Sequence, residues 1–177
     1  MNLSKQIHMK KLALSTSPDY YKGYIELAPD QPLMEVLPTG GIDLFVNELE
    51  TLKGIGQRVY APGKWTVNEL IQHLIDTERI FVNRALRFVR QDDTTLPGYD
   101  HNAYVPVSMA NDQSIDALLE EYLAVRKSTE LFYRPLTEKQ LLSSGTASSV
   151  QISPLSIGYI LIGHPTHHFN VIMERYL

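Results

Sequence analysis

The segment 66–90 most strongly constrains the fold, because its apolar residues follow a helical period over its whole length. Thr66 and Glu69 form a capping-box pattern, in which each side chain satisfies a free backbone N–H group of the first turn. At about 100° per residue, the apolar residues form an arc that is wider than a surface helix needs: Val67, Leu70, Ile71, Leu74, Ile75, Phe81, Ala85, Phe88 and Val89. We therefore expect a long helix that contacts neighbours on two sides and lies near the centre of a helical bundle.

Two further segments carry the same kind of pattern. Apolar residues share one stripe of a helix over 42–56, and glycine and proline residues follow it. A third helix is expected to begin after Asp112 or Ser114 and to end before Pro135, because its apolar residues again share one face. These segments supply partners for the wide apolar arc of the helix over 66–90.

The C-terminal part predicts the fourth helix of the bundle. Ser153 is a favourable N-cap, and Pro154 occupies the first helical position, where proline is favoured. A capping box predicts a short helix over 137–142, and small residues predict a loop over 145–150. No run alternates cleanly enough to require a sheet. The predicted fold class is all-α: a four-helix bundle with a long crossover between helices 2 and 3, over 91–111, and short extra helices.

The sequence divides into two regions. Residues 1–40 contain four prolines, and we expect an irregular N-terminal segment with short helical turns around 19–27 and 33–37. Residues 41–177 are expected to form the bundle domain. The segment is expected to pack onto that domain through three tyrosines: Tyr20, Tyr21 and Tyr24.

The composition excludes several classes of protein. The chain has 177 residues and no cysteine, which excludes disulfides, zinc–thiolate sites and cysteine nucleophiles. Sixteen Lys and Arg against twenty Asp and Glu give a net charge of −4, without the basic surplus typical of nucleic-acid-binding proteins. No apolar stretch reaches the roughly 20 residues that span a bilayer. We expect a cytoplasmic protein that binds neither nucleic acid nor membrane.

Three histidines lie close together in the last predicted helix: His164, His167 and His168. His164 and His168 are one turn apart, about 6 Å along the helix axis, on a face that also carries apolar residues. Two imidazoles that point into a core need a partner, and a divalent cation about 2.0–2.1 Å from each nitrogen satisfies both. Hydrogen bonds to the backbone or to each other are the alternative. His167 points about 60° away, towards the rim or behind the ligands.

A third ligand is expected from another helix. His73 lies at the edge of the apolar arc of the helix over 66–90 and completes a set of three: His73, His164 and His168. His8 and His101 are expected to be exposed to solvent. Neighbouring carboxylates are alternative oxygen ligands, namely Glu69, Asp76 and Glu78, and Asp76 or Glu69 could instead support the histidines from behind.

Glu78 also falls within an apolar arc, where a carboxylate needs a partner. Arg126 lies on the apolar stripe of the third predicted helix and is the expected partner. We prefer a buried ion pair that fixes the register of the two helices to a catalytic role for Glu78. Trp65, just before the central helix, is expected to act as a hydrophobic lid.

Several stretches together form a specific pattern: Lys64-Trp65-Thr66-Val67, His73 to Phe81, Arg84-Ala85-Leu86, Pro97-Gly98-Tyr99-Asp100, Val125-Arg126, Gly145-Thr146-Ala147-Ser148, and Gly163-His164 to Asn170. This pattern covers roughly residues 20 to 177 and resembles the DinB-like superfamily of four-helix-bundle metal-binding proteins. The resemblance implies a divalent metal ion, often zinc or nickel, on three histidines at the positions of His73, His164 and His168. Similar proteins include transferases that use bacillithiol or related thiols, a mycothiol-dependent isomerase and metal-dependent hydrolases.

Two features depart from the family pattern. Pro165 stands where similar sequences have an acidic residue, and proline inside a helix removes a hydrogen bond and costs about 3 kcal/mol. A kink at Pro165 would tilt His164 relative to His168. Pro38 and Gly40-Gly41 also interrupt what is usually a continuous first helix.

The resemblance and the histidines together predict a metal-dependent enzyme that carries out thiol transfer or hydrolysis on a small molecule. A thiol would have to come from a cosubstrate, because the chain has no cysteine. The alternative is a non-catalytic metal-binding or stress-associated module, which the kink at Pro165 favours. A homodimer is compatible with either. An enzyme requires a pocket that reaches the metal, with Trp65 and the crossover as its expected walls.

Overall fold

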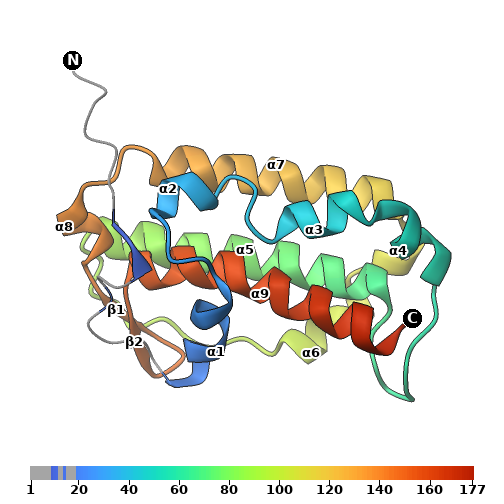
Figure 1. The fold of residues 1–177 in the computed structure, drawn as a ribbon. Helices are drawn as coiled ribbons and strands as arrows, with labels where there is room; N and C mark the ends of the chain where they lie inside the picture. The colour runs from blue at the N-terminus through green and yellow to red at the C-terminus, as the bar shows by residue number, and fades with distance from the viewer. Residues whose placement is uncertain (1–8, 12–13, 15–18) are drawn as a thin grey trace.

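The computed structural model describes residues 9–11, 14 and 19–177, and Figure 1 shows long helices that run side by side. The expectation about His8 lies outside these residues. The described elements are α1 (Asp19–Leu27), α2 (Leu33–Val36), α3 (Ile42–Asn47), α4 (Leu49–Ile55), α5 (Val67–Val89), α6 (His101–Tyr104), the 3-10 turns η2 (Val105–Val107) and η3 (Ala110–Asp112), α7 (Ile115–Tyr133), α8 (Glu138–Leu141), β1 (Gly145–Ala147), β2 (Val150–Ile152) and α9 (Pro154–Arg175). Helices α5, α7 and α9, with the pair α3–α4, confirm the predicted four-helix bundle and its crossover between helices 2 and 3.

The long helices begin at the capping residues that the sequence predicts. The Thr66 hydroxyl accepts a hydrogen bond from the Glu69 N–H, and the Glu69 carboxylate accepts one from the Thr66 N–H at 2.7 Å. At the starts of α7 and α9, the hydroxyls of Ser114 and Ser153 accept hydrogen bonds from the N–H groups three residues later. Each cap satisfies an N–H group that has no partner within its own helix. The start of each helix is therefore determined locally.

Two predicted elements differ from the structure. The helix expected over 42–56 is divided into α3 and α4 at Glu48, which has φ −103° and ψ 19°. The loop expected over 145–150 is a β-hairpin, in which β1 and β2 pair antiparallel across a turn at Ser148 and Ser149. Both serines have positive φ, 53° and 62°. Such turns favour Asn-Gly, and strands of three residues are too short to show alternation, so neither usual sequence signal of a hairpin is present.

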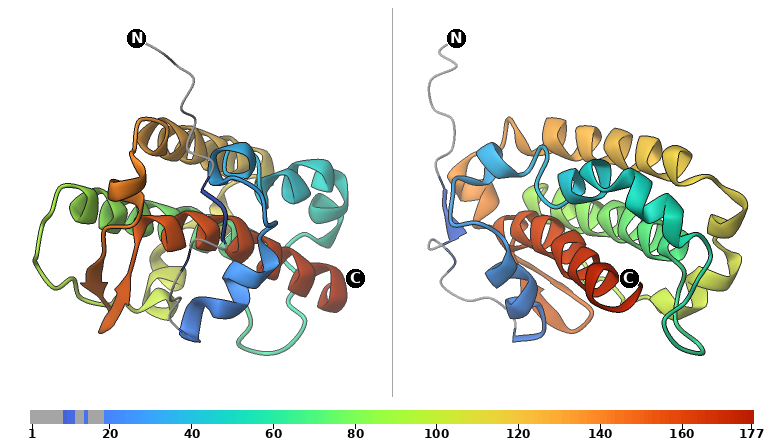
Figure 2. Two further views of the ribbon diagram at one scale, coloured as in Figure 1. Left: turned by 60° about the vertical axis from the view of Figure 1, so that its left-hand side comes forward. Right: turned by 45° about the vertical axis from the view of Figure 1, so that its right-hand side comes forward.

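The short helical turns expected around 19–27 and 33–37 are confirmed as helices α1 and α2. Helix α1 packs along α9, and a Cβ atom at Gly163 would lie 1.7 Å from the Tyr24 carbonyl oxygen, so only glycine allows this approach. Tyr21 packs inward as predicted, but Tyr20 is 72% exposed, contrary to expectation. Helix α1, the hairpin and α6 lie on the side of α5 and α9 that faces away from α7 (Figures 1 and 2).

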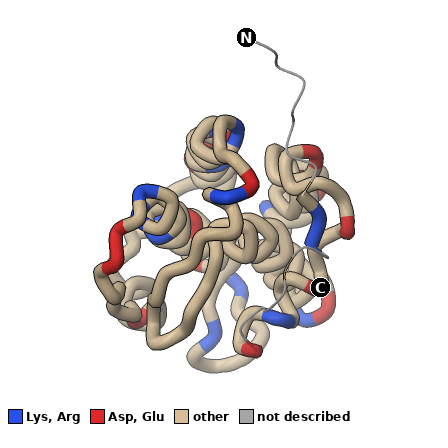
Figure 3. Tube along the Cα trace, turned by 90° about the vertical axis from the view of Figure 1, so that its left-hand side faces the viewer, with Lys and Arg blue, Asp and Glu red and all other residues tan. Residues whose placement is uncertain are grey.

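Charged residues are distributed over the surface of the bundle. In the view of Figure 3, basic and acidic positions are interspersed along the helices and loops. None of the described helices is long and apolar enough to cross a membrane.

The predicted ion pair between Glu78 and Arg126 lies between two halves of the hydrophobic core. On α5 and α7, Ile75 and Tyr122 belong to one buried cluster, whereas Phe81 and Tyr133 belong to the other. The Arg126 guanidinium donates to the Glu78 carboxylate from Nε at 2.9 Å and from Nη2 at 2.8 Å, and both side chains are 1% exposed. The Thr129 hydroxyl donates to the same carboxylate at 2.7 Å.

Arg126 also binds three backbone carbonyl groups. Nη1 donates to the Leu37 and Gly40 carbonyl oxygens, both at 2.9 Å. Nη2 donates at 2.7 Å to the carbonyl oxygen of Leu161. In a regular helix this carbonyl would accept from the residue four positions later, but that residue is Pro165, which has no N–H. The guanidinium therefore supplies the hydrogen bond that the proline removes.

The glycines at the interrupted first helix fit against the same proline. Gly41 has φ +78°, and a Cβ atom there would lie 2.5 Å from Pro165 Cγ. Helix α9 continues through Pro165 from Pro154 to Arg175. The two departures from the family pattern are thus in contact with each other, and both are stabilised by Arg126.

We predict that Arg126→Met lowers the free energy of unfolding by about 3 to 5 kcal/mol, because Glu78 is left buried and unpaired. The double variant Glu78→Leu/Arg126→Met should recover only part of this loss, since three carbonyl groups stay without a donor. Urea unfolding monitored by circular dichroism measures both values. Arg79→Met, which removes an exposed pair with Glu121, is the control and should cost less than about 1 kcal/mol. A loss below about 1 kcal/mol for Arg126→Met would contradict the role of the pair.

Candidate metal centre

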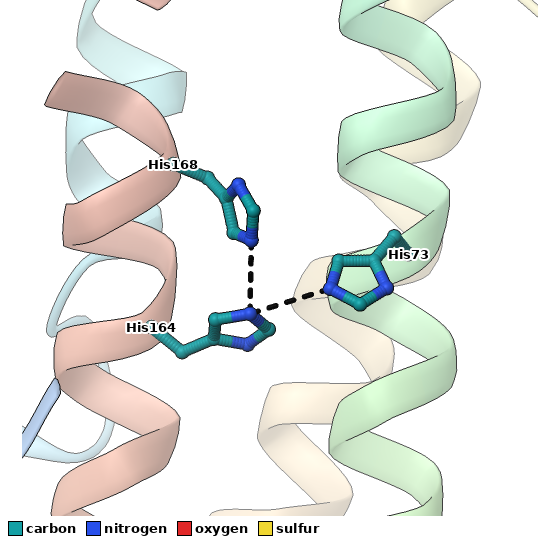
Figure 4. A group of neighbouring side chains, drawn as sticks. All are labelled: His73, His164 and His168. Atoms are coloured by element: carbon teal, nitrogen blue, oxygen red, sulfur yellow. Dashed lines mark hydrogen bonds between the residues drawn. The ribbon is translucent and has the colours of Figure 1, made fainter. Parts of the chain in front are cut away.

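The structure brings together the three histidines that the sequence singled out. His73 projects from α5 towards His164 and His168, which project from α9 one turn apart (Figure 4). Nε2 of His164 lies 3.3 Å from Nε2 of His73 and 2.9 Å from Nε2 of His168. One ring nitrogen from each histidine lies within 4.8 Å of the others, so the cluster could hold a metal ion. The expected tilt of His164 away from His168 is therefore not observed.

The two Nε2–Nε2 distances from His164 match those between ligands around one ion. Two nitrogens that are each about 2.05 Å from an ion, at an angle of about 90° to 109°, lie about 2.9 to 3.3 Å apart. Hydrogen bonds alone fit less well, because a neutral imidazole nitrogen carries either one proton or one lone pair. Nε2 of His164 faces two other ring nitrogens and can make a well-aligned hydrogen bond with only one of them.

Burial keeps these imidazoles in the neutral form that binds metals. Desolvation, with a smaller contribution from the nearby His101, lowers the pKa of His73 to about 4. Desolvation and the neighbouring imidazoles lower the pKa of His168 to about 3 and that of His164 well below its usual value. At neutral pH all three rings offer a lone pair and need not lose a proton before binding a cation.

The carboxylates considered as alternative ligands have other contacts. Glu69 binds the Thr66 N–H and accepts from Asn111 at 3.1 Å, and Glu78 binds Arg126. Asp76 accepts from the Gln72 amide at 3.0 Å. None of the three belongs to the histidine cluster among the residues that the structure describes. The expectation that Asp76 or Glu69 supports the ligands stays a prediction.

The histidine cluster opens into a cavity of about 460 Å³, within the usual range for a small-molecule site. Its walls include Trp65 and Tyr99, as expected for the start of α5 and for the crossover. Trp65 is therefore part of the pocket wall, since its ring centroid lies 5.0 Å from that of His73. His101, expected to be exposed, is half-buried, and its ring centroid lies 5.5 Å from that of His73.

Two pocket residues were given no functional role by the sequence reasoning. Arg84 is 4% exposed and donates to the Ser148 hydroxyl at 2.9 Å. The Tyr99 hydroxyl lies 2.9 Å from the Thr77 hydroxyl and holds the crossover against α5. Arg84 lies on the same face of α5 as His73, because eleven residues complete about three turns. The eleven-residue spacing from His73 is the sequence signal that places Arg84 on the pocket face of α5.

Comparison with known protein families identifies the fold's relatives. A family model described as the DinB superfamily matches residues 45–172, which is most of the chain. The chain belongs to the DinB superfamily. The resemblance seen in the sequence is thereby confirmed, although a search of curated proteins found no match.

A solved structure similar to this DinB-superfamily chain is YfiT from Bacillus subtilis, described as a probable metal-dependent hydrolase with an unusual four-helix bundle topology. The similarity covers 98% of this chain and 95% of YfiT, with a TM-score of 0.67 and 19% sequence identity. At this level of identity the match establishes the shared fold. The match extends beyond residues 45–172 and includes the region of α1.

We predict that metal-free protein loses stability as the pH falls from about 6.5 towards 4. In this window His73 takes up a proton in the unfolded chain, where its pKa is near 6.5, but stays neutral in the folded protein, where burial lowers its pKa to about 4. His73→Gln should reduce the loss at pH 5 by about 1 to 2 kcal/mol. Urea unfolding at pH 7, 6 and 5 measures the difference. Equal losses for both proteins would contradict the burial of a neutral His73.

Proposed function

We propose that this protein is a metal-dependent enzyme in which His73, His164 and His168 bind one divalent ion, zinc or nickel, and which hydrolyses a small molecule. The observation that carries the proposal is the convergence of three neutral imidazoles on one point at the wall of an open cavity. Three protein ligands with an open position are typical of catalytic rather than structural zinc sites. The description of YfiT as a probable metal-dependent hydrolase supports the same reaction class.

The pocket residues have distinct roles in this proposal. A divalent ion, when bound, supplies Lewis acidity that polarises a carbonyl group or activates a water molecule or a thiol. The three histidines hold it, and Trp65 and Tyr99 limit the access of bulk water on the crossover side. His101 lies close enough to His73 to contact a substrate at the open position. We assign no general base.

Thiol transfer is the second candidate reaction. It needs the same metal site, and its thiol must come from a cosubstrate because the chain has no cysteine. A low-molecular-weight thiol and an electrophile would then have to share the cavity. The third candidate, a non-catalytic metal-binding module, is disfavoured by the cavity, because a storage or structural site gains nothing from an opening of this size.

We predict that zinc or nickel binds the protein, purified without a histidine tag, at one ion per chain and raises its melting temperature. His164→Ala should abolish stoichiometric binding, because one of three ligands is lost. His167→Ala is the matched control: its ring is not part of the cluster, and binding should persist. Metal analysis after dialysis and thermal melting give both results. Failure of zinc and nickel to stabilise the wild-type protein would contradict the proposed site.

We predict that the zinc- or nickel-loaded protein hydrolyses members of an ester and amide panel and that His164→Ala removes this activity. A parallel panel of thiols with electrophiles tests transfer under the same conditions. Turnover in the second panel alone would replace hydrolysis by thiol transfer. Hydrolysis at an unchanged rate in His164→Ala would place the chemistry elsewhere.

A further inference from the structure

Among the described residues that line the cavity, Arg84 alone carries a permanent charge. The described cavity wall contains aromatic side chains, hydroxyl groups and imidazoles, but no aspartate or glutamate. Arg84 is 4% exposed, and none of the ion pairs found among the described residues includes it. Residues 1–8, 12–13 and 15–18, which the structure does not describe, contain no aspartate or glutamate that could pair with Arg84. A buried cation without a carboxylate partner is costly unless another anion pairs with it.

The guanidinium of Arg84 is fixed in place by its surroundings. Nη2 donates to the Pro97 carbonyl oxygen at 3.2 Å and to the Ser148 hydroxyl at 2.9 Å. The guanidinium carbon lies 5.0 Å from the centroid of the Phe81 ring and 5.8 Å from that of Tyr99. These contacts come from α5, the crossover and the hairpin turn. They orient the side chain, and they contribute no negative charge.

The turn of the β-hairpin places Ser148 at this contact. Its φ of 53° lies in the left-handed region, which non-glycine residues rarely adopt. The N–H of Ser148 donates to the Leu96 carbonyl oxygen at 3.0 Å, which ties the hairpin to the crossover. A two-residue hairpin turn requires positive φ at both central residues, and here the turn places the Ser148 hydroxyl 2.9 Å from Nη2 of the buried Arg84.

We infer that Arg84 binds an anionic group of the substrate, so that the substrate is an elongated small molecule with a carboxylate or phosphate at the end remote from the three histidines. Arg84 and His73 are eleven residues apart on one face of α5, about 16 Å along the helix axis. A ligand that reaches both sites must therefore be longer than a single functional group. The planar fork of a guanidinium matches carboxylate and phosphate oxygens.

This inference rests on the proposed function for the reacting end of the substrate, and the probes separate the two. Suberic acid monohydroxamate has a metal-binding hydroxamate at one end and a carboxylate at the other. Octanohydroxamate has the same chain length and a neutral end, and a terminal phosphonate analogue tests phosphate. Succinic acid monohydroxamate is the short control. Calorimetric titration of metal-free and zinc-loaded protein gives the dissociation constants.

We expect the charged long probes to bind about ten- to a hundredfold more tightly than octanohydroxamate, as one hydrogen-bonded ion pair provides. Whichever of the carboxylate and phosphonate probes binds more tightly identifies the anionic group that Arg84 prefers. Arg84→Gln keeps hydrogen-bond donors for Pro97 and Ser148 but removes the charge, and should abolish the preference. Arg84→Lys should restore part of it. Arg87→Gln, which breaks an ion pair with Asp92 outside the cavity, should leave it unchanged.

Zinc should strengthen the binding of charged and neutral probes alike, and His164→Ala should remove that gain without removing the charge preference. Absence of a zinc effect would therefore count against the proposed metal site alone. Two results with the wild-type protein would overturn the inference about Arg84: equal affinities for suberic acid monohydroxamate and octanohydroxamate, or no binding of either. It would also be overturned if the preference for the charged probe survives Arg84→Gln, or if the short control shows an equal preference.

Discussion

The guanidinium of Arg126 connects four parts of the chain that are distant in sequence. It pairs with Glu78 on α5, extends from α7, and donates to carbonyl groups before α3 and within α9. A charge at the centre of a bundle is stabilising only when its donors have acceptors and a counter-ion pairs with it. Here the Thr129 hydroxyl donates a further hydrogen bond to the Glu78 carboxylate. This network therefore ties α5 to α9, beside the apolar packing between them, and the three histidines lie on those two helices.

Pro165 shows how this network affects the candidate site. A proline one residue after His164 frees the Leu161 carbonyl group, and without a donor α9 would be expected to bend between His164 and His168. Arg126 supplies the donor, while Gly41 leaves room for the proline ring. Helix α9 then keeps both imidazoles on one face, with their Nε2 atoms 2.9 Å apart. Pro165, which the sequence alone would suggest disturbs the histidine cluster, is therefore accommodated by Arg126 and Gly41.

Much of the fold follows from local signals. Capping residues such as Thr66 and Ser153 mark where helices begin, and a four-residue spacing places His164 and His168 together. The residues that were misjudged depend on long-range packing. His101 was expected to be exposed but becomes part of the pocket wall because the crossover folds back onto α5. The place of Arg84 in the pocket becomes apparent only when the hairpin turn lies against it. Sequence periodicity describes one helix at a time and carries no information about such contacts.

The ligands that surround a metal ion bound to this protein show most directly whether α5 and α9 form one site. X-ray absorption spectroscopy at the zinc edge, on protein loaded with one equivalent of zinc, measures the number and type of the ligands. We predict three imidazole nitrogens at about 2.0 to 2.1 Å, with oxygen completing the coordination. A shell with one imidazole or none, or a spectrum that His164→Ala leaves unchanged, would contradict the proposal that α5 and α9 together hold the ion.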